Sequence, residues 1–175
     1  MILTANIISF IGSLVMVGIG FIRERRRILI AQCVQWVIMS VSNLMLGGVT
    51  GLISNAVSIL RNLYSLKRDL TRPVKYGFIA LQIAISIPFN KLGLLGWLPV
   101  FAAVSFTLFL DFKDERVLKL AIIFGQLLWA VFDFSLKNYA AFAFDLFTCV
   151  STLIGIYRIM RARKAAQSAD DAAKQ

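Results

Sequence analysis

Two acidic side chains, Asp133 and Asp145, stand inside long apolar runs in the second half of the chain. Asn43 and Asn55 stand at the matching places 90 residues earlier. An ionised carboxylate inside a bilayer costs at least a few kcal/mol, so such residues usually carry function. The four side chains together offer hydrogen-bond acceptors and negative charge, which suits a polyhydroxylated or cationic small molecule. Asp145 is also a candidate proton carrier, whereas Asp133 could extend to the nearby membrane rim instead.

Further polar and aromatic residues recur at helical spacing next to these four. Small polar residues at i, i+3 and i+7 mark one face of a helix, and such a face could line a pocket between helices. Ser and Thr also serve as helix–helix contacts, and a Trp inside a span often packs in the core. Both alternatives stay open for these residues. The expected binding residues are Trp36, Asn43, Asn55, Ser58, Asn62, Gln126, Trp129, Asp133, Asp145 and Thr148.

Arg61 is the one basic residue well inside an apolar run. Its long side chain could reach the membrane interface near Lys67 and Arg68, because arginine buries its stem while its charge stays in water. The alternative is a role in gating. We therefore expect Arg61 to be either an anchor or a gate.

Long apolar segments must position all of these residues. Of 175 residues, 59% are hydrophobic and 16% are charged, against about 45–50% and about 25% in soluble domains. A membrane-spanning helix needs about 20 mostly apolar residues. The sequence therefore predicts an all-α membrane protein without a separate soluble domain. Its seven expected spans are approximately 2–22, 28–46, 49–66, 75–89, 92–110, 118–136 and 139–160.

The basic residues predict how the chain crosses the membrane. Sixteen Lys and Arg residues lie in the connections after spans one, three, five and seven, and the opposite side has only Lys91 and Lys137. Positive charge marks the cytoplasmic side, so we expect the N-terminus outside and the C-terminus inside. The formal net charge of +10 then reflects orientation and lipid contact, and nucleic acid is not an expected partner.

The matched polar positions indicate an internal repeat with an offset of 90 residues. We expect a first three-helix repeat at 1–68, a linker helix at 69–91, a second repeat at 92–164 and a disordered cytoplasmic tail at 165–175. One linker crossing makes the two repeats parallel. Transporters with this layout bind their substrate at the interface between the repeats.

These features favour a small-molecule transporter, working by facilitated diffusion or linked to protons. The alternatives are a membrane scaffold or sensory subunit that uses the basic cytoplasmic face, and, third, a cation channel. An enzyme is least favoured, because the chain has no His and no nucleophile motif. Cys33 and Cys149 do not form a metal-binding pattern, so no metal or cofactor is expected. A homo-oligomer stays open.

Two stretches resemble a known family. The segment LGGVTGLISNAVSILRNLY (46–64) and the closing segment around Asp145 are similar to the YgjV family of bacterial inner-membrane proteins. More remotely, the three-one-three layout resembles the SWEET sugar carriers, their half-length relatives (SemiSWEETs) and the PnuC vitamin carriers. In SWEETs an Asn on the third helix of each repeat lines the sugar pocket. That resemblance implies the same role for Asn55, with Asp145 in place of its partner.

Overall fold

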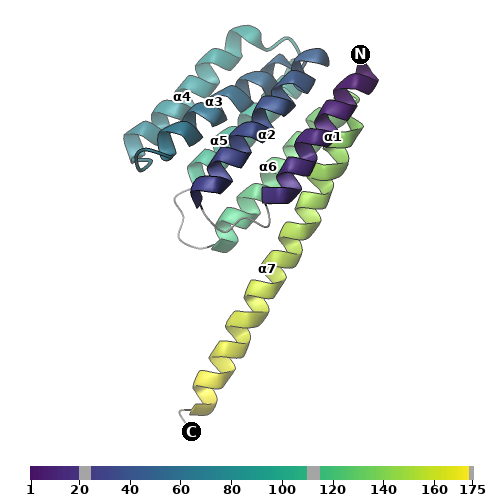
Figure 1. Ribbon diagram of the computed structural model, residues 1–175. Coiled ribbons are helices and arrows are strands. Elements are labelled where there is room, and N and C mark those ends of the chain that lie inside the picture. The colour runs from purple at the N-terminus through teal and green to yellow at the C-terminus, as the bar shows by residue number, and fades with distance from the viewer. Residues whose placement is uncertain (20–24, 110–114, 174–175) are drawn as a thin grey trace.

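The computed structural model describes residues 1–19, 25–109 and 115–173, and every regular element in these ranges is a helix (Figure 1). The seven helices predicted from the apolar segments are confirmed in the described residues, with ends that differ by a few residues except at the C-terminal end of the last helix. The charged positions 23–24 and 113–114 and Lys174 lie outside the described residues. The helices are α1 (Ile2–Ile19), α2 (Arg25–Met45), α3 (Val49–Ser65), α4 (Arg72–Phe89), α5 (Leu94–Phe109), α6 (Glu115–Ser135) and α7 (Tyr139–Ala173).

Helix α7 is longer than predicted. The segment 165–173 was expected to be disordered, but α7 continues through it to Ala173 and projects beyond the other helices (Figure 1). The segment is rich in alanine, the residue with the highest helix propensity. Local propensity therefore extends the helix past the last apolar residues.

Length and composition single out one stretch of the described chain as able to cross a membrane by itself. This is Tyr139–Arg161, with 23 residues. Three other apolar helical stretches are somewhat shorter, namely Ile2–Met16, Leu29–Met45 and Leu94–Phe109.

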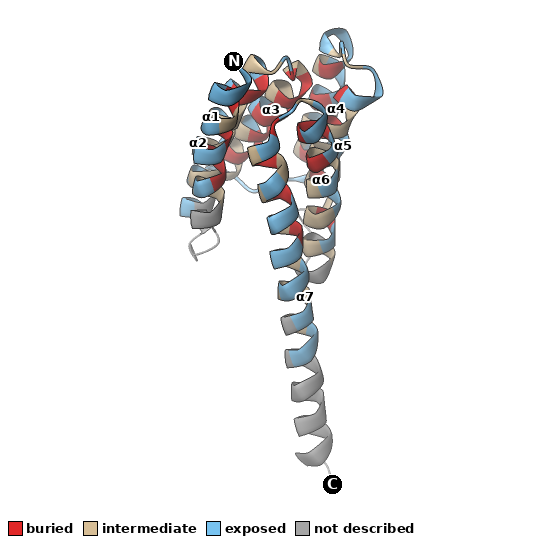
Figure 2. Ribbon diagram, turned by 90° about the vertical axis from the view of Figure 1, so that its right-hand side faces the viewer, coloured by how far each residue is buried: buried red, intermediate tan, exposed pale blue. Residues whose placement is uncertain are grey.

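The described helices bury polar side chains and expose large apolar ones. Buried residues include Ser9, Ser42, Thr50 and Ser54, while Leu3 and Phe147 are among many large apolar side chains on the outside (Figure 2). Exposed apolar surface on this scale is unusual for a soluble monomer and typical of a surface that contacts lipid or a partner. The described surface is therefore consistent with a membrane protein.

Six of the described helices contact one another in a ring, and α4 lies beside this ring. The ring runs α1, α2, α3, α5, α6 and α7, and α7 contacts α1. Helix α4 contacts α3 and α5, and Gln82 on α4 donates to Ser54 Oγ on α3 at 2.9 Å. Ser9 on α1 donates to Ser42 Oγ on α2 at 2.6 Å. Small polar side chains such as these let helices approach closely.

The turns after α2 and α6 have the same backbone hydrogen bonds. In the first, Gly48 N donates to Asn43 O at 2.7 Å, and in the second, Asn138 N donates to Asp133 O at 2.9 Å. The two pairs lie 90 residues apart in the sequence. The side chains of α6 also reach the start of α3, because a Cβ built on Gly48 would lie 2.6 Å from Leu136 Cδ1. The two turns therefore lie at one end of the bundle, which we call the turn end.

Replacing Lys137 with Gly should stabilise the protein. Lys137 has φ +60°, and the residue at the matching place in the first turn is Gly47, with φ +77°. A non-glycine residue pays roughly 1–2 kcal/mol for this left-handed conformation. We expect Lys137→Gly to raise the unfolding free energy by about 1 kcal/mol and Gly47→Ala to lower it similarly. Thermal unfolding of both variants in detergent measures this, and a Lys137→Gly variant less stable than the parent would contradict it.

Candidate functional site

The two acidic side chains predicted from the sequence meet inside the bundle. Asp133 on α6 is 1% exposed and Asp145 on α7 is 9% exposed, and their carboxyl groups lie close enough to interact. Asn138 Nδ2 also donates to Asp133 Oδ1 at 3.0 Å. Asp133 therefore does not extend to the rim, the alternative that its place in the sequence allowed, and Asp145 Oδ2 has no partner.

Two asparagines lie in the other half of the bundle with unsatisfied amide groups. Asn43 on α2 is fully buried, and neither its Nδ2 nor its Oδ1 has a hydrogen-bond partner. Asn55 on α3 is 3% exposed, and its Nδ2 also has no partner. An unpaired buried polar group costs about 1–3 kcal/mol. These amides are therefore available to a ligand or to water.

Asn43 lies close to the helix that carries Asp133. A Cβ built on Gly51 would lie 2.9 Å from Asn43 Nδ2 and 2.8 Å from Phe132 Cε1, so the amide and the ring meet at the same glycine. Asn55 follows Gly51 by one turn on the same face of α3. We refer to Asn43, Asn55, Asp133 and Asp145 as the turn-end cluster.

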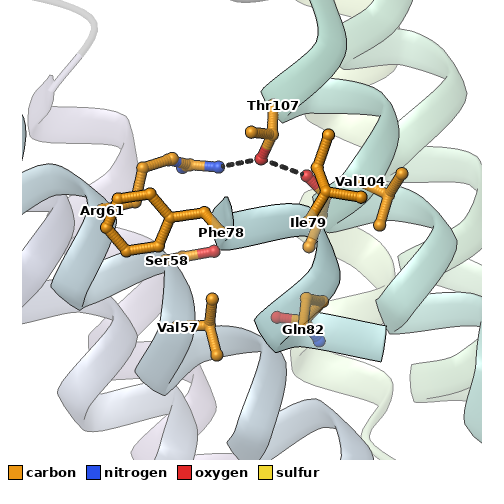
Figure 3. Close-up of a pocket in the computed structure, with 9 residues that line it drawn as sticks. Val57, Ser58, Arg61, Phe78, Ile79, Gln82, Val104 and Thr107 are labelled. Carbon is orange, nitrogen blue, oxygen red and sulfur yellow. Dashed lines mark hydrogen bonds between the residues drawn. The ribbon is translucent and has the colours of Figure 1, made fainter. Parts of the chain in front are cut away.

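Arg61 lies in the C-terminal half of α3 and is 2% exposed. Its Nη1 donates to Thr107 Oγ1 on α5 at 2.7 Å (Figure 3). Its guanidinium lies over the rings of Trp36, at 5.8 Å, and Phe106, at 5.1 Å. The guanidinium is thus held inside the bundle, and in the structure it does not extend to the interface near Lys67. Thr107 supplies a hydrogen bond and the two rings supply cation–π contacts in place of water.

A small cavity of about 10 Å³ adjoins Arg61. Helices α3, α4 and α5 form it, and several lining residues are drawn in Figure 3. Ser58, one of the predicted binding residues, lies in its wall. The residues that line it are Val57, Ser58, Arg61, Phe78, Ile79, Gln82, Ala103, Val104 and Thr107.

The other predicted polar residues make two further sets of contacts. Gln126 Nε2 and Thr148 Oγ1 each contact Met16 Sδ on α1 at 4.0 Å. Asn62 Nδ2 donates to Gln32 Oε1 on α2 at 2.8 Å, so this amide joins two helices.

The two predicted indoles also lie apart. Trp129 packs edge-on against Phe132, with ring centroids 5.7 Å apart, next to the turn-end cluster. Trp36 lies instead against Arg61. The structure does not bring the two indoles to one ligand position.

Three residues that are buried or join two helices by hydrogen bonds are absent from the sequence prediction. Asn6 Nδ2 donates to Lys137 O at 2.9 Å, and its Oδ1 accepts from Ala140 N at 3.0 Å, so Asn6 holds α1 to the second turn. Asn138 bonds to Asp133 as described above, and Gln82 lines the cavity. An amide inside an apolar run is the signal that could have identified Asn6 and Gln82.

The chain matches the family model Imp-YgjV, whose description is bacterial inner membrane protein, over residues 3–163. This match covers most of the chain, so the protein belongs to this family of the bacterial inner membrane. The resemblance expected from the segment 46–64 and from the closing segment is confirmed. Neither the curated proteins nor the solved structures contain a match to the chain.

Proposed function

We propose that this member of the Imp-YgjV family is a multi-pass transporter that carries a polar or cationic small molecule across the inner membrane. The observation that carries the proposal is the turn-end cluster, in which two buried carboxyl groups lie close together and the buried amides of Asn43 and Asn55 each have a nitrogen without a partner among the described residues. Polar groups of this kind inside a membrane protein commonly line a substrate or proton pathway.

All seven helices cross the membrane in this proposal, with the N-terminus outside and the C-terminus in the cytoplasm. Exposed apolar side chains on α1, α2, α5 and α6 support it, because lipid can cover them. The basic connections support the orientation. With this orientation the turn end faces outward.

Two parallel three-helix repeats, α1–α3 and α5–α7, form the transporter, and α4 links them. The two matching turns support this, and so do the contacts within the ring. Helix α3 contacts α5, and α7 contacts α1. If the two repeats change places, α3 takes the place of α7 and α5 that of α1, so the α3–α5 contact becomes the α7–α1 contact. A two-fold repeat requires this exchange.

The substrate site lies between the repeats, at the turn-end cluster. In the described chain the backbones of α2 and α6 do not approach within 8 Å, and side chains occupy the space between them. Phe132 and Leu136 close the turn end against Gly48 and Gly51 on α3. Alternating access would move one triplet of helices against the other and separate this contact.

The chemistry of the site favours a solute with several hydrogen-bond donors or a positive charge. The acidic pair offers hydrogen-bond acceptors, and its negative charge would attract a cation. Sugar-like, nucleoside-like and vitamin-like molecules with such groups fit this description. Transport is either facilitated diffusion or linked to protons.

The proposal is tested by thermal unfolding of the purified protein with sugars, nucleosides, vitamins, amino acids and polyamines, at acid and neutral pH. A ligand at about 100 times its dissociation constant adds roughly 2.7 kcal/mol to stability. We expect such a shift for the parent and its loss in Asp145→Asn, because a neutral amide at this position cannot carry the charge or the proton.

The matched control is Asp69→Asn, since Asp69 is exposed in the connection after α3. This variant should retain the ligand shift. Any hit is then followed by uptake into proteoliposomes. No shift with any compound, or a hit that persists in Asp145→Asn, would contradict the proposed site.

A membrane scaffold or sensory subunit is the second candidate. A groove of about 440 Å³ between α2 and α3 favours it, because Arg26 and Lys67 line it together with Tyr64. This function predicts that Arg26→Gln and Lys67→Gln disturb a partner contact, while the acidic pair tolerates substitution. Pull-down with the doubly substituted variant and with Asp145→Asn separates the two functions.

A further inference from the structure

Arg61 presents a charge that the described chain does not neutralise. Its guanidinium is 2% exposed, and among the described residues no carboxylate forms an ion pair with it. Its neighbours are a hydroxyl and two aromatic rings, and its Nε has no hydrogen-bond partner. A buried charge is normally paired, because the loss of hydration costs several kcal/mol. The described side chains that contact Arg61 include no carboxylate.

The cavity beside Arg61 has the size for a small occupant. Its volume of about 10 Å³ is close to the space that one water molecule needs. An organic carboxylate or a phosphate group does not fit. A chloride ion is larger than water, so its entry requires an outward shift of the half-buried Phe78 and Ile79 on the α4 wall.

The polar groups around the cavity suit an anion. The Thr107 hydroxyl already donates to Ala103 O at 2.7 Å, so Arg61 and Ser58 are the free donors of the wall. Gln82 Nε2 donates to Ser54 and Ser86, which leaves its Oε1 without a partner. Hydroxyl groups can donate as well as accept. In the opposite amide orientation Oε1 would accept from both serine hydroxyls, and the NH₂ group would become the unpaired donor.

A second basic side chain is buried near the cavity. Lys75 on α4 is 8% exposed, and its Nζ donates to Leu108 O at 3.3 Å, next to Thr107 in the sequence. A water molecule would satisfy hydrogen bonds but would leave the charge of Arg61 uncompensated. We propose that the α3–α4–α5 cavity binds one small monovalent anion of the chloride class on Arg61, Ser58 and Gln82.

The test is the anion dependence of thermal unfolding at constant ionic strength, with chloride or bromide replacing gluconate. Gluconate is too large for the cavity. We expect a saturable rise in Tm, by roughly 5–10 °C at about 100 times the dissociation constant of the halide. Arg61→Gln should abolish the rise, and Arg61→Lys, which retains the charge, should keep part of it. Arg26→Gln is the control, because Arg26 is exposed, and it should respond like the parent.

Two results would overturn the proposal. Equal Tm in chloride and gluconate for the parent protein would mean that the cavity holds water alone, and this comparison needs no variant. A halide response that survives Arg61→Gln would place the anion elsewhere. The inference does not depend on the proposed transport. The ligand screen with Asp145→Asn is carried out at one fixed chloride concentration, so either experiment can fail without affecting the result of the other.

Discussion

Phe132→Ala is expected to lower the unfolding free energy by about 3–5 kcal/mol, the cost of emptying a buried aromatic site. Phe132 is fully buried, and its ring packs against Trp129 on its own helix. Atoms of the Phe132 ring also lie 3.0 Å from the position of a Cβ on Gly48 and 2.8 Å from that of a Cβ on Gly51. The substitution therefore removes a contact within α6 and the contact between α6 and α3 together.

The matched control for this prediction is Phe124→Ala on the same helix. Phe124 is 52% exposed, so its ring loses few protein contacts when truncated, and the expected cost is below about 1 kcal/mol. Unfolding in mixed detergent micelles, followed by circular dichroism, gives both values. Similar costs for the two variants would show that Phe132 is not a central packing residue.

Gly51→Ala is expected to destabilise the protein by about 1–3 kcal/mol, the usual cost of overpacking. The new methyl group would stand 2.8 Å from Phe132 Cε1 and 2.9 Å from Asn43 Nδ2. The ring is fully buried and cannot retreat without moving α6. The same variant should also weaken ligand binding, since it displaces the amide of Asn43.

Gly77→Ala provides the opposite expectation on a neighbouring helix. Gly77 lies inside α4, and a Cβ there would have no heavy atom within 4 Å. Alanine is favoured over glycine in a helix by roughly 1 kcal/mol, so this variant should be more stable than the parent. Equal effects of the two glycine substitutions would contradict the close contact of the Phe132 ring with Gly51.

The contrast between these sites matters for the proposed transport cycle. If the contact of Phe132 with Gly51 closes the turn end, Gly51→Ala should favour the conformation in which these two residues are apart. Accessibility of a cysteine introduced at Leu136 to a membrane-impermeant thiol reagent measures this. Greater labelling in Gly51→Ala than in the parent is the expected result.

The sequence by itself determined the helices. Each one needs only a run of apolar residues and a polar or glycine-containing connection, and both are local features. Gly47 with its positive φ ends α2 in this way, and Pro73 falls at the start of α4, where its missing amide costs nothing. Burial of Asn43, Asn55, Asp133 and Asp145 was also predictable, because lipid cannot satisfy these groups.

The tertiary structure alone decided which of these groups meet. Asp133 contacts Asp145 while Trp36 and Trp129 lie apart, and Arg61 bonds to Thr107, 46 residues away, instead of reaching the interface. Such contacts depend on how each helix is rotated and which neighbour it packs against. Rotation is set by many side chains on different helices at once, so no spacing within one segment encodes it. Spacing along the chain could therefore identify the buried charges but not their partners.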